Sequence, residues 1–519
     1  MPRRLPVAAG GSDASGLAGL LEPGVSTYHG VEHPDPSLIN DDIKPTSEAE
    51  RHWSVANMAS LWIGMVVCVP TYTLAGGLID QGMSWWQAVL TISLGNLIVL
   101  VPMILNGHPG TKYGIPFPVL ARASFGILGA HIPSLLRALV ACGWFGIQTW
   151  FGGFAIYQLL DGLLGGALQL PDLPLLGISA TEFGCFLAFW LLQIAIVYRG
   201  IESIRVLETL AAPFLIGIGL ALLAWAYLAA GGFGPMLSAP SAFAPGGPKE
   251  GQFWTVFFPS LTAMVGFWAT LSLNIPDFTR YARCQRDQIL GQAIGLPATM
   301  TLFAFISVAV TSATVVIYGE PIWDPTVLAG KMGGGATVLI SLLALAIATL
   351  STNIAANVVS PANAIINLDP QRFSFRLGGY ITAGIGLAIF PWKLIESTEG
   401  YIFTWLIGYS ALLGPVGGIL VADYFLLRRT DLDLEALYRR SGPYWYVVGV
   451  NPAALIAFVL AVLPNLPGFL HQAGLIDGFP ALAVFDQIYL YAWFVGFALA
   501  AVLYLGLMAR SADPSKITG

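Results

Sequence analysis

The sequence predicts an all-α protein that crosses a membrane about twelve times. Hydrophobic residues make up 56% of the 519 residues, charged residues make up only 10%, and the mean hydropathy is +0.73. Soluble domains carry about a quarter charged residues, so the composition excludes a soluble globular protein. The apolar runs are continuous over roughly 20 residues rather than alternating, which predicts transmembrane helices instead of a β-barrel.

Twelve apolar runs are long enough to span a bilayer. They lie at residues 54–79, 84–106, 132–161, 177–198, 206–231, 253–275, 291–318, 335–361, 375–393, 399–425, 447–466 and 483–509. If the first residues are cytoplasmic, 20 of the 23 Lys and Arg residues fall inside, and only Lys249, Lys331 and Lys393 fall outside. This bias predicts cytoplasmic N- and C-termini for an integral protein of the plasma (inner) membrane.

The remaining composition adds no soluble domain and no metal chemistry. Residues 1–50 contain Gly, Ser, Pro and Asp without a periodic apolar face, which predicts a disordered cytoplasmic tail. Cys68, Cys142, Cys185 and Cys284 are irregularly spaced and form no CxxC pair. We therefore expect neither a disulfide framework nor a zinc site.

Two spans are interrupted near their middle. Pro70 lies inside the first span, where it removes a backbone donor and should free the carbonyls around residues 64–67. Gly266 weakens the sixth span at a similar depth. Broken backbone at membrane depth survives only where protein or a water-filled cavity covers it. Breaks five spans apart predict two five-helix repeats of inverted topology with a site between them, although ordinary kinks remain an alternative for each break.

These breaks suggest the division of the chain. We expect a cytoplasmic tail at 1–50, a ten-helix core at 51–430 with repeats at about 54–231 and 253–425, two additional helices at 431–510, and a cytoplasmic tail at 511–519.

The third span contains an indole and a carboxamide one helical turn apart, at Trp144 and Gln148. Residues at i and i+4 share a helix face, so the indole can stack on a planar ring while the amide bonds the edge of that ring. This pair indicates a site for a nucleobase or a similar heterocycle. The alternative is an interfacial anchor, which is a common role of tryptophan in membrane helices.

The eighth span carries neighbouring hydroxyls at Ser351 and Thr352. Together with main-chain carbonyls of Gly64, Val67 and Ala348, they would form a five-oxygen site suited to a hard monovalent cation, with sodium the natural candidate. The alternative is that both hydroxyls bond back to the preceding turn of their own helix. Asn357, five residues beyond Thr352, could face the same cavity as Trp144 and Gln148.

No ionisable residue lies in the middle of the first, third, sixth or eighth span. Intramembrane charges usually mark charged substrates and proton relays, so a neutral ligand is predicted. An enzyme would need a catalytic cluster of carboxylates, histidines or cysteines at this depth, and the sequence offers none. A channel would more often show a continuous polar path, whereas paired broken helices favour alternating access.

Five motifs support a family resemblance. They are NGHPGTKYG at 106–114, FPVLARASFG at 117–126, NIPDFTR at 274–280, STNIAAN at 351–357 and SPA at 360–362. Over residues 53 to about 445 the chain strongly resembles the nucleobase:cation symporter 1 family, whose members carry uracil, cytosine, purines, allantoin or hydantoins. The resemblance implies a leucine-transporter-like fold of ten core helices plus two.

The resemblance also implies roles for individual residues. Trp144 and Trp268 would sandwich the substrate ring, Gln148 and Asn357 would bond its edge, and Phe267 would lie beside it through its backbone. It places the cation at Gly64, Val67, Ala348, Ser351 and Thr352. Cys68 stands where hydantoin and allantoin carriers have Gln or Asn, which removes one amide contact from the substrate position.

The segments at 69–72 and 408–415 look closer to the plastid uracil and purine carriers of plants. We therefore expect an importer of a neutral nucleobase, with uracil favoured, that functions as a monomer and uses a coupling cation but no other cofactor. An allantoin or hydantoin carrier of the same family remains the alternative, and sodium is favoured over the proton as the coupling ion.

Overall fold

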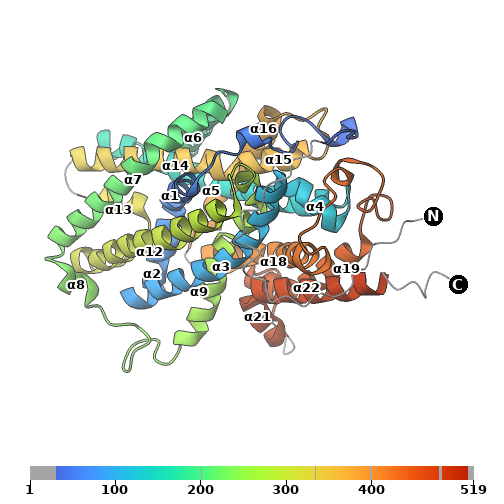
Figure 1. Cartoon of the computed structure of the whole chain (residues 1–519). Coiled ribbons are helices and arrows are strands. Elements are labelled where there is room, and N and C mark those ends of the chain that lie inside the picture. Colours follow the sequence, from blue (N-terminus) through green and yellow to red (C-terminus); the bar gives the residue numbers. More distant parts are fainter. Residues whose placement is uncertain (1–30, 200, 333–334, 398–399, 479–481, 512–519) are drawn as a thin grey trace.

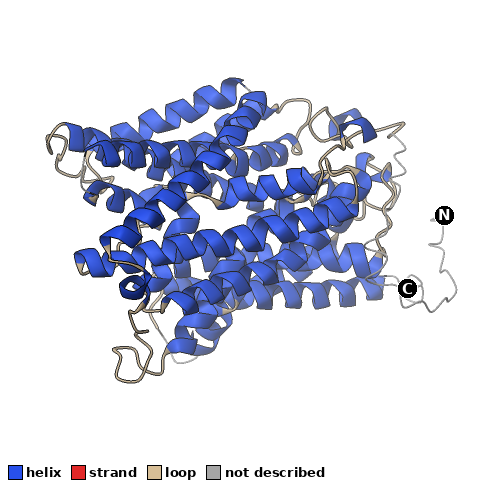
Figure 2. Ribbon diagram, turned by 60° about the vertical axis from the view of Figure 1, so that its left-hand side comes forward, coloured by secondary structure: helices blue, strands red, loops and turns tan. Residues whose placement is uncertain are grey.

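The computed structural model describes residues 31–199, 201–332, 335–397, 400–478 and 482–511. In this part of the chain the secondary structure is helical, apart from three isolated β-bridges (Figure 2). Most of the helices run lengthwise through the molecule, with α8 at one end and α4 at the other (Figure 1).

The spans follow one another along the chain. The first six are α1 (Val55–Val66) with α2 (Val69–Asp80), α3 (Trp85–Tyr113), α5 (His131–Leu163), α6 (Ala180–Arg199), α7 (Ile201–Ala229), and α9 (Phe253–Phe267) with α10 (Ala269–Asn274). The next six are α12 (Gln285–Tyr318), α14 (Gly335–Asn357) with α15 (Val359–Ile366), α16 (Phe375–Ala388), α18 (Ile407–Val421) between the π-helical segments η3 (Gly400–Leu406) and η4 (Ala422–Leu427), α19 (Pro452–Val462) with α20 (Leu466–Gln472), and α21 (Leu482–Leu490) with α22 (Ala492–Ser511).

Short helices connect the spans. They are α4 (Phe117–Phe125), α8 (Phe233–Leu237), α11 (Pro276–Thr279), α13 (Pro325–Lys331) and α17 (Pro391–Leu394), with 3-10 turns η1 (Pro36–Leu38), η2 (Glu48–Glu50), η5 (Ala436–Tyr438) and η6 (Leu463–Asn465).

The predicted number of spans agrees with the structure. Among the described residues, eight helices are long and apolar enough to cross a membrane, and the bent pair of α1 and α2 makes a ninth. The other three are α7, whose described apolar part is short, the interrupted α9 with α10, and the 14-residue α16. The predicted all-helical fold is therefore confirmed, although α3 continues seven residues beyond the expected end of its span.

The first span breaks where Pro70 predicts it. The helices α1 and α2 meet at 60°, with Cys68 in an extended conformation and Pro70 in the first turn of α2. The backbone N–H of Cys68 turns to the carbonyl of Val66 at 2.9 Å instead of bonding Gly64. The carbonyl of Gly64 is thereby released from its usual helical partner.

The sixth span breaks at Trp268, which separates α9 from α10. Just before it, Gly266 lies against α18, because a Cβ at this position would come within 2.2 Å of the Ser410 hydroxyl oxygen. Only glycine allows this close approach of the sixth span to the tenth. Around the two breaks, α1 packs against α12 and α14, whereas α9 and α10 pack against α3 and α18.

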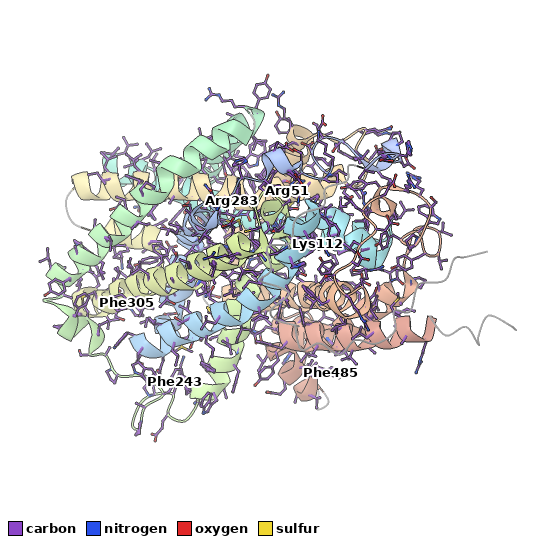
Figure 3. All side chains as sticks on the ribbon, in the orientation of Figure 1. Arg51, Lys112, Phe243, Arg283, Phe305 and Phe485 are labelled. Carbon is purple, nitrogen blue, oxygen red and sulfur yellow. The ribbon has the colours of Figure 1, made fainter. Side chains whose placement is uncertain are left out.

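Arg51, Arg283 and Lys112 lie near the middle of the view in Figure 3, whereas Phe305 and Phe243 lie toward its left side.

Residues 31–50 differ from the predicted disordered tail; residues 1–30 and 512–519 lie outside the described part of the chain. Leu38 and Ile43 are 3% and 0% exposed, and the Tyr438 hydroxyl donates to the carbonyl of Ile43 at 2.8 Å. Isolated apolar residues and hydrogen bonds to main-chain carbonyls thus hold this segment against the loop that contains Tyr438, although it has no periodic apolar face.

Arg122 anchors the same segment from α4. Its guanidinium donates to the carbonyls of Leu38 and Leu437, both at 3.0 Å, and to the Asn367 side-chain oxygen at 2.6 Å. Burial lowers the pKa of Arg122 to about 10, so the group remains charged at neutral pH. Three acceptors from distant parts of the chain therefore depend on one planar donor.

Replacing Arg122 by lysine should destabilise the protein. An ammonium keeps the charge but cannot span three acceptors in one plane, so at least one buried carbonyl loses its partner at a cost of about 1–3 kcal/mol. Thermal unfolding in detergent or nanodiscs measures the effect. The control is Arg440→Lys, at a half-exposed arginine 3.4 Å from Asp35, where a change within about 0.5 kcal/mol is expected. Equal unfolding temperatures for both variants would contradict the anchoring role.

Candidate substrate and cation site

An aromatic group lies where α5 meets the two broken spans. The ring centroids of Trp144 and Phe267 are 5.3 Å apart, and those of Phe267 and Trp268 are 4.9 Å apart. Trp62 of α1 contacts Trp268 at 5.3 Å. All three contacts are edge-to-face, an arrangement that aromatic quadrupoles favour. The structure thus places Trp144 and Trp268 in one group, with Phe267 in contact with both.

Gln148 follows Trp144 by one turn of α5, as its spacing predicts. The side chain is 4% exposed, and its Oε1 accepts no hydrogen bond from any described residue. A buried carbonyl oxygen without a partner carries a desolvation cost that a donor on a bound ligand would remove. The Trp268 indole nitrogen is likewise buried without a partner among the described residues.

Asn357 ends α14 and reaches α5 through a second asparagine. Its Nδ2 donates to Oδ1 of Asn353 at 2.9 Å, and Nδ2 of Asn353 donates to the Phe145 carbonyl at 3.0 Å. Phe145 directly follows Trp144, so Asn357 is tied to the stretch of α5 that carries the aromatic ring and Gln148. This connection links the three substrate positions expected from the sequence on α5 and α14, which are Trp144, Gln148 and Asn357.

Two amides of this region were not predicted. Asn353 and Gln193 are both fully buried and hydrogen-bonded to each other at 2.7 Å. Asn353 lies four residues before Asn357, so their shared helix face was a usable signal. Gln193 of α6 is a lone amide in an apolar span, and only the packing of α6 on α5 reveals its partner.

The expected cation residues meet where α14 crosses the break in the first span. The Thr352 hydroxyl donates to the released carbonyl of Gly64 at 3.3 Å, and Val67 packs against Ala348. The side chain of Ser351 lies outside the described residues. Carbonyl and hydroxyl oxygens without an acidic residue form a donor set that suits a monovalent rather than a divalent cation.

Cys68 lines a small cavity beside the break in the first span. Its sulfur is 3.2 Å from the Thr71 hydroxyl, and the cavity, of about 60 Å³, has Tyr72 and Phe303 in its walls. Trp144, Phe267 and Trp268 do not line this cavity. This cavity lies between the first, fifth, seventh and eighth spans, beside the Val67 and Ala348 contact.

The site is closed and carries no formal charge. The six expected substrate residues, Trp144, Gln148, Phe267, Trp268, Asn357 and Cys68, are each 3–6% exposed. The helices α1, α9, α10 and α14 contain no ionisable residue. Among the described residues, no group of three His, Cys, Asp or Glu side chains could hold a metal ion. The arrangement can therefore stack and hydrogen-bond a neutral ring that it encloses.

A separate cavity of about 550 Å³ opens beside the C-terminal half of α5. Its walls include Trp150, Trp323 and Trp392, together with Glu320 and Lys331, which form an ion pair at 2.6 Å. Trp150 lies six residues after Trp144 and contacts Trp392 at 5.5 Å. Charged residues are thus present outside the closed site but not within it.

Comparisons with known proteins agree with this geometry. A family model described as a permease for cytosine/purines, uracil, thiamine and allantoin matches residues 45–496. A purine-uracil permease, NCS1, from Arabidopsis thaliana is 50% identical over 97% of this chain and 85% of its own length. An allantoin permease from Bacillus subtilis is 41% identical over 91% of this chain and 93% of its own length.

Solved structures share the fold. Mhp1, described as a nucleobase-cation-symport-1 family transporter in a closed conformation with bromovinylhydantoin bound, has a TM-score of 0.74 and 26% identity, covering 92% of this chain and 96% of its own. A Na⁺-coupled sialic acid symporter has a TM-score of 0.61 at 11% identity, covering 90% and 91%, which shows similarity of fold alone. These likenesses confirm the leucine-transporter-like arrangement with its 5+5 inverted repeat. The chain therefore belongs to the nucleobase:cation symporter 1 family of membrane permeases.

Proposed function

We propose that this protein is a secondary active transporter that imports a neutral nucleobase, with uracil favoured, by symport with a cation. The observation that carries the proposal is the buried aromatic group of Trp144, Phe267 and Trp268 beside the unpartnered amide oxygen of Gln148. The names of the Arabidopsis relative and of the family support purines and pyrimidines as the substrate class.

In this proposal the substrate ring inserts between the indoles of Trp144 and Trp268, and Phe267 adjusts beside it. When the ring binds, stacking contacts between the ring and the indoles replace the edge-to-face contacts between the aromatic side chains. Stacking on aromatic side chains contributes about 1–3 kcal/mol of binding free energy per base. Gln148 and Asn357 bond the edge of the ring. Because no charge lies nearby, a neutral ring is favoured over an ion, which would lose its hydration without compensation.

Coupling in this proposal uses the carbonyl of Gly64 and the hydroxyl of Thr352. Their hydrogen bond at 3.3 Å spans the first and eighth helices, and a sodium ion would draw both oxygens onto itself. The carbonyls of Val67 and Ala348 and the hydroxyl of Ser351 would complete the set. An ion there fixes the broken first span, so ion and substrate raise each other's affinity.

Alternating access requires helices that bend. The π-helical segments η3 and η4 at both ends of α18 are wider turns of a kind that recurs at functional sites. We propose α18 as a gate on this basis and α7 as its counterpart in the first repeat. The proposed setting is a monomer in the plasma membrane with both termini in the cytoplasm.

A ureide permease is the second candidate. The 41% identity to the Bacillus allantoin permease favours it, and an allantoin or hydantoin ring offers a similar planar edge with alternating carbonyl and N–H groups. The aromatic group would serve either substrate.

Trp144→Ala should lower the affinity for the transported base about 10- to 100-fold, because one stacking face is lost. Equilibrium binding of radiolabelled uracil to the purified protein measures this change. Trp150→Ala is the matched control on the same helix, since Trp150 packs against Phe154 and Trp392 instead of the aromatic group. Wild-type affinity in Trp144→Ala would remove the stacking model.

Competition distinguishes the two substrate candidates. Uptake of labelled uracil by cells expressing the protein should fall when excess unlabelled uracil is present and should respond less to allantoin, because uracil is the favoured ligand. Absence of uracil uptake together with saturable allantoin uptake would assign the protein to the ureide permeases instead.

Replacement of sodium by choline at constant pH should reduce uptake. Thr352→Val should raise the sodium concentration needed for half-maximal uptake severalfold, because the variant lacks one of the five proposed sodium ligands. Thr349→Val is the control on the same helix, since the Thr349 hydroxyl bonds its own Leu345 carbonyl at 2.8 Å. Uptake that is indifferent to sodium but follows the proton gradient would exclude sodium coupling.

A further inference from the structure

Four buried polar side chains form a network behind the proposed substrate position. Gln193 of α6, Thr149 of α5 and Asn353 of α14 are 0% exposed, and Asn357 of α14 is 6% exposed. Each of them hydrogen-bonds at least one other member of the group. Such networks fix side-chain orientation when every partner is satisfied.

A backbone carbonyl determines which way the Asn353 amide faces. The carbonyl of Phe145 can only accept a hydrogen bond, and the Asn353 amide group lies 3.0 Å from it. The atom facing Phe145 is therefore the amide nitrogen, and the carbonyl oxygen of Asn353 must face Asn357. The two flipped orientations of the Asn353 amide are therefore not equivalent, because only one of them places a donor on the Phe145 carbonyl.

Thr149 fixes the neighbouring amide in the same way. Its hydroxyl donates its only proton to the Phe145 carbonyl at 2.6 Å, so its oxygen can only accept from Gln193 at 2.8 Å. The Gln193 nitrogen thus faces Thr149, and the Gln193 oxygen faces Asn353 at 2.7 Å. The Phe145 carbonyl and the Gln193 oxygen therefore both require the amide nitrogen of Asn353 on the same side.

The consequence reaches Asn357. Its Nδ2 is held by the Asn353 oxygen at 2.9 Å, and a flipped Asn357 would place two carbonyl oxygens at that distance. No described residue donates to the Asn357 oxygen. Asn357 therefore presents a hydrogen-bond acceptor, whereas the amide of Gln148, which has no bonded partner in the described part of the chain, is free to turn.

We infer that Asn357 accepts a hydrogen bond from a ring N–H of the substrate, and that Asn353, Thr149 and Gln193 are positioning residues that hold it in this state. The inference rests on the proposed function of the site. It narrows the ligand class to rings that carry an N–H next to a carbonyl. The N–H would donate to the Asn357 oxygen, and the Gln148 amide can turn so that its nitrogen donates to the ring carbonyl. A ring with a bare nitrogen at the same edge would meet the Asn357 oxygen lone pair to lone pair.

Three uncharged pyrimidines test this polarity without added bulk. Cytosine carries a bare nitrogen where uracil has the N3–H, and 4(3H)-pyrimidinone carries one where uracil has the N1–H. Binding of each to the purified wild-type protein is measured by competition with labelled uracil. At least one of the two analogues should bind about 10- to 100-fold more weakly than uracil, because a donor is replaced by an acceptor.

Asn353→Ala should release the constraint. Asn357 can then turn its nitrogen toward the ring, so uracil should bind about tenfold more weakly and the disfavoured analogue should come within about threefold of it. Asn96→Ala is the control, because Asn96 is also a fully buried asparagine but bonds only the Ile92 carbonyl of its own helix. It should keep the wild-type ratio of affinities.

Thr149→Val and Thr149→Ser form a second pair of variants. Valine preserves the side-chain volume without the hydroxyl, whereas serine preserves the hydroxyl. Valine removes the oxygen that orients Gln193 and should reduce the uracil preference severalfold, while serine should retain it. An unchanged ratio of affinities in both Asn353→Ala and Thr149→Val overturns the positioning role, as does equal binding of all three rings to the wild type. Failure of the wild type to bind any nucleobase or ureide instead overturns the proposed function.

Discussion

The requirement that every backbone polar group at membrane depth find a partner inside the protein shapes this molecule. Where α1 stops, the N–H of Cys68 turns to Val66 and leaves the Gly64 carbonyl without its helical donor. Thr352 supplies a hydroxyl from α14 in its place. The contact holds α14 against the break, and the next residue of that helix, Asn353, bonds the Phe145 carbonyl of α5. The proposed cation position and the amide network therefore lie next to each other on α14.

The helices α1, α9, α10 and α14 contain no ionisable residue, and several buried charged groups of the described residues lie near helix ends. Asp423 pairs with Arg428 at 2.7 Å, and Asp277 accepts from the Phe117 backbone and the Ser360 hydroxyl, all near the end that carries α4. A charge at mid-depth would have to lose its hydration, whereas a neutral amide needs only matched partners. In the proposed function, substrate selectivity in the closed site depends on the direction of hydrogen bonds and on the shape of aromatic surfaces.

Local signals predicted the features that depend on neighbouring residues. Pro70 predicted the break in the first span, and helical periodicity placed Gln148 one turn from Trp144. The role of Gln193 could not be predicted, because its partners come from α5 and α14. The extension of α3 to Tyr113 was also missed, because the apolar run ends at Asn106. In the structure the Asn106 side chain donates to the Ser272 carbonyl of α10 at 2.7 Å, so this polar residue is accommodated inside the helix. Leu38 and Ile43 gave no periodic pattern, so their docking became visible only with the loops they contact.

The docking of residues 31–50 has a consequence for the order of assembly. Ile43 bonds Tyr438, 395 positions later in the sequence, and Asn40 bonds Pro370 at a separation of 330. A ribosome adds roughly 5–20 residues per second, so this early segment waits at least about 20 seconds before its last partner has been synthesised. During that time nearly every span has been inserted with the segment undocked. The first described part of the chain to be translated is therefore among the last to reach its native contacts.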